Sequence, residues 1–145
     1  MFKRLLLLKQ IPLSSNLCQL ALRIIVFGTL FLNHGTEKLF TFNAMSQNFA
    51  DPLHIGAIPS LAFATLSDGI CTLLVLAGLA TRWAALILFI NLFVAWVFQH
   101  HFLFLGKGAD HGELIVLYLG VSIALFFGGA GKFSIDALLD RPEKQ

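Results

Sequence analysis

Two charged residues, Arg23 and Asp68, lie inside long apolar stretches of the sequence. Counting 1.5 Å per residue from the expected helix ends puts Arg23 about 9 Å and Asp68 about 12 Å into a bilayer. A charge at the bilayer centre costs about 2.5–3.5 kcal/mol on insertion scales. We therefore expect both side chains to face the inside of the protein, where the guanidinium and the carboxylate can form an ion pair.

A second group of polar residues follows Arg23 in LNHGTEKLF. His34 and Glu37 come eleven and fourteen residues after Arg23, so at 3.6 residues per turn both point within about 40° of the direction of Arg23. This spacing predicts an inward-facing polar stripe. Lys38 is offset from it, and we expect its side chain to extend to the membrane surface. Asn91, in the third apolar stretch, is a further candidate for the interior.

More titratable side chains gather between the third and fourth apolar stretches. They are His100, His101, His111 and Glu113. Imidazole and carboxylate groups can bind metal ions or exchange protons. For any single histidine, a place in the polar rim of a membrane protein is the more ordinary interpretation, and Glu113 also suits the start of a helix. We assign no metal ligands from the sequence.

The composition explains why buried charge is unusual here. Of 145 residues, 57% are hydrophobic and only 12% charged, and the mean hydropathy is +0.82, whereas soluble domains carry about 25% charged residues. These values indicate an integral membrane protein with the lipid bilayer as its surroundings. The net charge of +2 gives no argument for nucleic acid. Cys18 and Cys71 lack a CxxC spacing, which favours packing over redox chemistry.

The predicted fold is all-α: an integral membrane four-helix bundle with a short interfacial helix between spans one and two. About 20 apolar residues are needed per span, and four stretches qualify. The interfacial helix carries Phe42, Met45 and Phe49 on one face and ends at Asp51-Pro52. The expected spans are roughly 17–39, 59–80, 82–105 and 112–131.

Lysine and arginine positions predict the orientation of the bundle. Seven precede span one, lie between spans two and three, or follow span four, whereas only Lys38 and Lys107 lie in the other connections. By the positive-inside rule both termini are cytoplasmic. We divide the chain into a cytoplasmic N-terminal segment (1–16), a four-helix transmembrane domain (17–138) and a cytoplasmic tail (139–145).

Three motifs together suggest a family. They are an early arginine followed by FLNHGTEKLF, an acidic residue in LSDGICTLLVLAGLATR, and the closing GGAGKFSID. In this order they resemble the DoxX family of small bacterial membrane proteins over roughly residues 18–138. The family usually has glutamate where Asp68 stands, and Gly129 and Ala130 alter its usual glycine-proline spacing. The resemblance implies four helices in the bacterial cytoplasmic (inner) membrane and a quinone-linked or redox-partner role.

Three functions stay open at this point. The first is a membrane subunit of a redox system, binding a quinone or similar small apolar molecule inside the bundle. The second is a non-catalytic scaffold or assembly factor in which the Arg23–Asp68 pair is structural, and the third is metal or proton handling by the outer His and Glu groups. The sequence has no haem-ligand pair, iron–sulfur cysteine set or nucleotide motif. Electrons would therefore come from a redox partner protein or from the substrate, and homo-oligomerisation is left open.

Overall fold

The computed structural model describes residues 14–102 and 112–140. Within these residues every regular element is a helix, so the all-α prediction is confirmed. The first span is a continuous helical segment, Ser15–Phe40, and Ser14 caps it by accepting a hydrogen bond from the Leu17 N–H at 3.2 Å. Along this span the α-helix is interrupted twice by π-helical turns, in the order α2 (Ser15–Leu22), η1 (Arg23–Phe27), α3 (Gly28–Leu30), η2 (Phe31–Gly35) and α4 (Thr36–Phe40).

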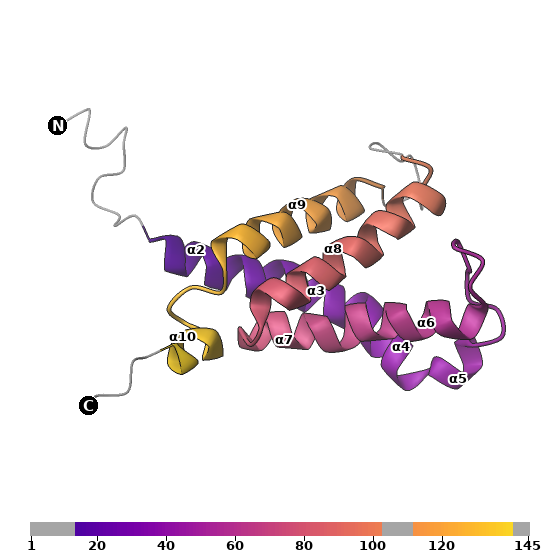
Figure 1. Ribbon diagram of the computed structural model, residues 1–145, viewed down its shortest axis with the longest axis horizontal. Coiled ribbons are helices and arrows are strands. Elements are labelled where there is room, and N and C mark those ends of the chain that lie inside the picture. Colours follow the sequence, from indigo (N-terminus) through magenta and orange to yellow (C-terminus); the bar gives the residue numbers. More distant parts are fainter. Residues whose placement is uncertain (1–13, 103–111, 141–145) are drawn as a thin grey trace.

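Three further long helical segments complete the bundle (Figure 1). The second span, Ala57–Ala77, also contains a π-helical turn. Short helices follow the first and the last spans. The elements are α5 (Phe42–Met45), α6 (Ala57–Thr65), η3 (Leu66–Cys71), α7 (Thr72–Ala77), α8 (Thr81–Phe98), α9 (Gly112–Gly128) and α10 (Ile135–Leu139).

The ends of the spans differ from the predicted ends where the backbone turns sharply. The second span begins at Ala57, not Pro59, because Gly56 with φ 105° ends the preceding loop and proline is tolerated in the first helical turn. The third span ends at Phe98, not near residue 105. His101 and Phe102 follow with φ of 46° and 60°, which no continuing helix permits.

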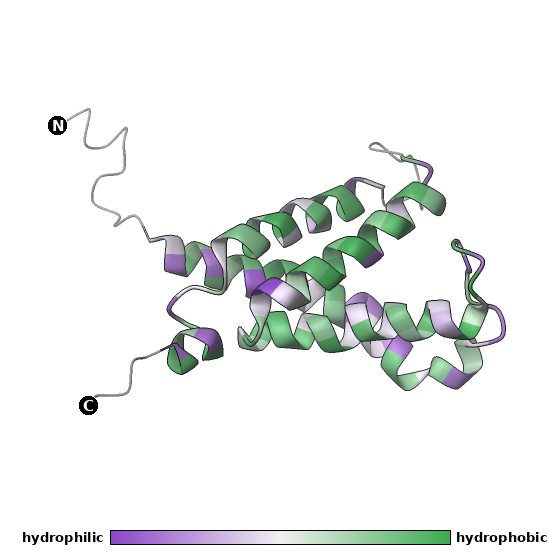
Figure 2. Ribbon diagram, in the orientation of Figure 1, coloured by the Kyte–Doolittle hydropathy of each residue, from purple (hydrophilic) through white to green (hydrophobic). Residues whose placement is uncertain are grey.

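The outer surface of the bundle is apolar. Three helical segments are long and apolar enough to cross a membrane, and α9 is a shorter apolar helix of 17 residues. Figure 2 shows hydrophobic residues along all four. Large side chains such as Ile25, Trp83 and Phe127 are 66–73% exposed, as suits contact with lipid tails. The protein is therefore a multi-pass membrane protein whose surroundings include the bilayer.

The interior is packed from all four spans. Phe27, Val75, Leu88 and Leu125 are fully buried and belong to one continuous core. Spans one and two approach each other closely at Gly35, where an added Cβ would overlap the backbone carbonyl of Asp68. Small residues at helix contacts permit such approach in membranes, where no hydrophobic drive holds helices together.

The two ends of the bundle are built differently. At the end we call the closed end, Asn16 Oδ1 accepts from the Lys132 N–H at 2.9 Å, and Gln19 Nε2 donates to the Gly128 carbonyl at 2.7 Å. The start of the first span and the end of the fourth therefore meet there, beside α10 (Figure 1). At the opposite end, which we call the open end, α5 and the following loop connect spans one and two.

Candidate functional site

A buried ion pair lies between the first and second spans. Lys38 Nζ is 3.0 Å from Asp68 Oδ2, and the two side chains are only 11% and 8% exposed. Asn91 Nδ2 on α8 donates to Asp68 Oδ1 at 3.0 Å, and Ser67 Oγ donates to the same oxygen at 3.1 Å. The Asp68 carboxylate is thus held by three donors in addition to its helix. Asp68 and Asn91 face the interior, as expected.

Lys38 does not extend to the membrane surface, and that expectation is wrong. Glu37 is the exposed neighbour, so the predicted inward stripe of Arg23, His34 and Glu37 is also wrong in its last member. The reason is local: η1 and η2 are π-helical, and their wider turns change the direction of every later side chain relative to a count of 3.6 per turn. Lys38 occupies the inward position that the count gave to Glu37.

Arg23 does not pair with Asp68, and this prediction is wrong. Its guanidinium, 1% exposed, lies at the closed end and donates to four backbone carbonyls. Helix ends leave carbonyls without intrahelical partners, and the planar five-donor guanidinium satisfies several at once. Gly78, with φ 71°, leaves room for it, because an added Cβ would lie 2.6 Å from Arg23 Nη2. The acceptors are Val75 (2.7 Å), Leu76 (2.7 Å), Ala130 (2.9 Å) and Phe133 (2.9 Å).

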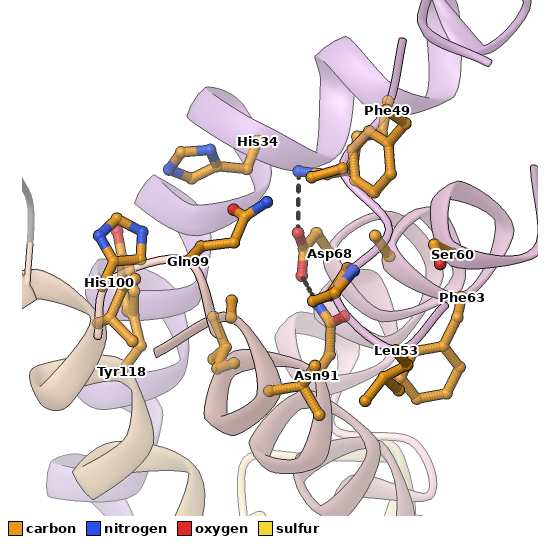
Figure 3. A pocket seen from close by; sticks show the side chains of 18 of the residues that line it. His34, Phe49, Leu53, Ser60, Phe63, Asp68, Asn91, Gln99, His100 and Tyr118 are labelled. Atoms are coloured by element: carbon orange, nitrogen blue, oxygen red, sulfur yellow. Dashed lines mark hydrogen bonds and ion pairs between the residues drawn. The ribbon is translucent and has the colours of Figure 1, made fainter. Parts of the chain in front are cut away.

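The Lys38–Asp68 pair forms one wall of a cavity of about 270 Å³ at the open end. Figure 3 shows His34, Gln99 and His100 on one side of this cavity and Leu53 and Phe63 on the other. Most of the wall is apolar, so a ligand would meet a small number of polar groups in fixed places. The polar lining consists of His34, Lys38, Ser60, Asp68, Asn91, Gln99, His100 and Tyr118.

Three of these polar residues were not anticipated from the sequence. Lys38 was expected at the membrane surface, and Ser60 and Tyr118 were not considered as site residues. Tyr118, 3% exposed, is the only tyrosine in the chain, and its hydroxyl lies 3.5 Å from Thr29 Oγ1. A lone tyrosine in the middle of an apolar span was the available signal, since a buried phenol needs a hydrogen-bonding partner.

The connection between spans one and two covers the cavity. Met45 and Phe49 line it, as the predicted interfacial helix implied, although the α-helical part is only four residues long. The Asp51 carboxylate holds the loop by accepting from the N–H groups of Ile55 (3.0 Å) and Gly56 (2.7 Å) and from Ser60 Oγ (2.8 Å). Desolvation raises the pKa of Asp51, but these hydrogen bonds outweigh it and hold the pKa below its usual value.

The remaining rim candidates are scattered. His100 lines the cavity, whereas His101 and Glu113 are exposed and His111 lies outside the described residues. Among residues 14–102 and 112–140, no group of three or more His, Cys, Asp or Glu could hold a metal ion. The polar side chains that this cavity brings closest together are Lys38, Asp68 and Asn91, which are joined by an ion pair and a hydrogen bond.

Fold and site define a multi-pass helical membrane protein with a ligand-sized cavity over a buried ion pair. The sequence matches the DoxX family over residues 18–101, and the chain belongs to this family. It is also 34% identical over 125 residues to an uncharacterized protein of Haemophilus influenzae, an alignment that covers 81% of this chain and 87% of that protein. No solved structure matches.

Proposed function

We propose that this protein is the membrane subunit of a redox system and binds a quinone, or a similar small apolar molecule, in the open-end cavity. The observation that carries this proposal is the cavity itself: about 270 Å³, mostly apolar walls, and a fixed polar group of Lys38, Asp68 and Asn91. Apolar pockets with a few convergent polar groups are the usual form of small-molecule sites.

The polar group matches the needs of a quinone. The Lys38 ammonium and the His34 and Gln99 side chains can donate to carbonyl oxygens. Reduction of a quinone takes up two electrons and two protons, and the imidazole of His34 in the cavity wall is a group that can pass protons to it. The electrons come from a redox partner protein or from the substrate itself, so this chain supplies binding and proton transfer.

Membrane placement follows from the charge distribution. We place the protein in a bacterial inner membrane with both termini in the cytoplasm. The reason is that Arg82 and Lys132 lie at the closed end, where the first span begins and the fourth span ends. The cavity then opens on the side away from the cytoplasm.

The test is quinone binding by the purified protein in mild detergent. Ala95 lines the cavity, so Ala95→Phe fills it without touching the ion pair. Ile90, on the same helix and 45% exposed toward lipid, gives the matched control Ile90→Phe. We expect saturable binding of a short-chain quinone to the wild type and to Ile90→Phe, and at least about tenfold weaker binding to Ala95→Phe. Equal binding by all three proteins, or none by the wild type, would contradict the proposal.

The scaffold alternative loses its original basis, since it depended on the Arg23–Asp68 pair. Arg23 still has a structural task, joining the ends of the second and fourth spans through four carbonyls. That task belongs to the closed end. It leaves the cavity at the open end available for a ligand.

A further inference from the structure

A second hollow, of about 460 Å³, lies at the closed end. It is formed where the start of α8, the end of α9 and the segment through α10 come together, so it is at the opposite end of the bundle from the quinone site proposed above. None of its residues lines the open-end cavity. The lining comprises residues 80–83, 128–131, 134, 136, 137 and 140.

The hollow contains a buried hydroxyl without a partner. Thr81 is 0% exposed, and its Oγ1 makes no hydrogen bond within the described part of the chain. Thr72, the other buried threonine among the described residues, differs in this respect: its Oγ1 donates to the Gly69 carbonyl at 2.9 Å. Because leaving a buried hydroxyl unpaired is unfavourable, an occupant that hydrogen-bonds Thr81 is favoured there.

Charges of both signs line the same hollow. The Arg82 guanidinium donates to the Phe127 carbonyl at 3.1 Å and has further donors, since arginine carries five. The Asp136 carboxylate accepts from the N–H groups of Ala80 (2.7 Å) and Thr81 (3.0 Å), and so already binds the N–H groups at the N-terminus of α8. Asp140 is exposed at the edge. A simple anion would meet two carboxylates, and a simple cation would meet Arg82.

The flanks of the hollow are apolar. Trp83 directly follows Arg82 in the chain and is 72% exposed. Phe127 directly precedes Gly128 and is 73% exposed. Tryptophan and arginine are typical of the membrane–water interface. The hollow is therefore open to the region where lipid headgroups lie, with surfaces for acyl chains beside it.

We propose that this hollow binds the headgroup of a zwitterionic phospholipid of the phosphoethanolamine type. Its phosphate accepts hydrogen bonds from Arg82 and from the Thr81 hydroxyl, and its primary ammonium donates to Asp140 and Asp136. A trimethylammonium headgroup cannot make the second set of hydrogen bonds, and a glycerol headgroup lacks the positive charge. Both signs of charge in the hollow are then matched by one molecule.

The test is lipid retention by native mass spectrometry of the whole chain in detergent, with phosphatidylethanolamine, phosphatidylcholine and phosphatidylglycerol offered in turn. Soluble glycerophosphoethanolamine is a fourth arm that separates a bound lipid from its free headgroup. We expect phosphatidylethanolamine to be retained at least about tenfold more strongly than the other three. Equal retention of phosphatidylcholine or phosphatidylglycerol would overturn the charge matching, and equal binding of the soluble headgroup would overturn the lipid as occupant.

Three variants locate the site. Thr81→Val removes the hydroxyl at constant shape, and Arg82→Gln removes the charge; each is expected to weaken phosphatidylethanolamine retention by roughly tenfold. Lys132→Gln is the control, because Lys132 is an exposed cation of the closed end outside the hollow. Thr81→Val breaks no hydrogen bond of the described chain, so its thermal unfolding temperature should not fall below that of the wild type. Unchanged retention in Thr81→Val and Arg82→Gln, or an equal loss in Lys132→Gln, would refute the proposal.

Discussion

Lys38 and Asp68 neutralise each other in a place where neither charge could stand alone. Removing one partner leaves an uncompensated buried charge or polar group, which typically costs about 3–5 kcal/mol. We therefore expect Lys38→Met to lower the thermal unfolding temperature in detergent sharply. The double variant Lys38→Met with Asp68→Leu should recover most of the loss, because a buried pair can be replaced by apolar residues of similar volume. A double variant less stable than Lys38→Met would contradict the pairing.

Arg23 is held by geometry as well as by charge. Lysine keeps the charge but cannot present a planar fork to four carbonyls at 2.7–2.9 Å. We expect Arg23→Lys to destabilise the protein by about 2–4 kcal/mol, since at least one buried carbonyl loses its donor.

The measurement for Arg23→Lys is thermal unfolding beside quinone binding. Because Arg23 lies at the closed end, binding to protein that remains folded should be unchanged. A wild-type unfolding temperature in Arg23→Lys would show that the four hydrogen bonds contribute little.

For single residues, the sequence predicted which side chains are buried in the bundle better than it predicted which groups they contact. Arg23, Asp68 and Asn91 were placed inside because charge and amide groups are costly in lipid, and that rule needs no structure. Their partners depend on side-chain direction, which the π-helical turns alter. Nothing in RIIVF or FLNHG distinguishes a π-helical turn from an α-helical one, so Lys38 could not be preferred over Glu37.

Among the elements, the contact of spans one and two depends on Gly35. An added Cβ there would overlap the Asp68 carbonyl, a backbone atom that cannot move aside without shifting the second span. We expect Gly35→Ala to reduce stability and to weaken quinone binding, because it displaces Asp68. Gly28→Ala is the matched control in the same span, since an added Cβ has nothing within 4 Å.

The control also has an expected direction. Alanine is favoured over glycine inside a helix by roughly 0.5–1 kcal/mol, so Gly28→Ala should be neutral or slightly stabilising. Unfolding temperature and quinone affinity of both variants check the comparison. Equal effects of the two substitutions would mean that the close approach at Gly35 is unimportant.

The loop that covers the cavity should release at low pH. The pKa of Asp51 is lowered by its hydrogen bonds, so the stability it contributes is fully present above its unfolded value of about 3.9 and is lost as pH falls through the lower folded value. We expect pepsin to cut within residues 46–56 only well below pH 4. Asp51→Asn should be cut at pH 4.5 already; wild-type cleavage at that pH would contradict the anchoring.

The spans themselves were predictable because their signal is a long average over apolar residues. Their ends were not, because they are set by single backbone conformations such as those of Gly56 and His101. The hydrogen bonds of the Asp51 loop were also out of reach. A loop of mixed polarity has no periodicity to show which carboxylate holds it.

For the molecule as a whole, the two ends have separate tasks. At the closed end, Arg23 donates hydrogen bonds to backbone carbonyls of the glycine-rich segment between α9 and α10. At the open end, a loop covers a cavity. The relative placement of the ends was implied by the even number of spans. The cavity at the open end was not, since its volume depends on how side chains of all four spans pack.

The division between the ends predicts the topology. Ser14, at the start of the first span, and α10 both lie at the closed end (Figure 1). The first span therefore begins at the same end of the bundle at which the segment after the fourth span lies. Arg82 and Lys132 lie at that end and favour the cytoplasm. We expect a green fluorescent protein fused after Gln145 to fluoresce, and alkaline phosphatase fused there to be inactive. Alkaline phosphatase fused after Asn48, in the open-end loop, should be active. The opposite pattern would invert the molecule in the membrane and put the open-end cavity on the cytoplasmic side.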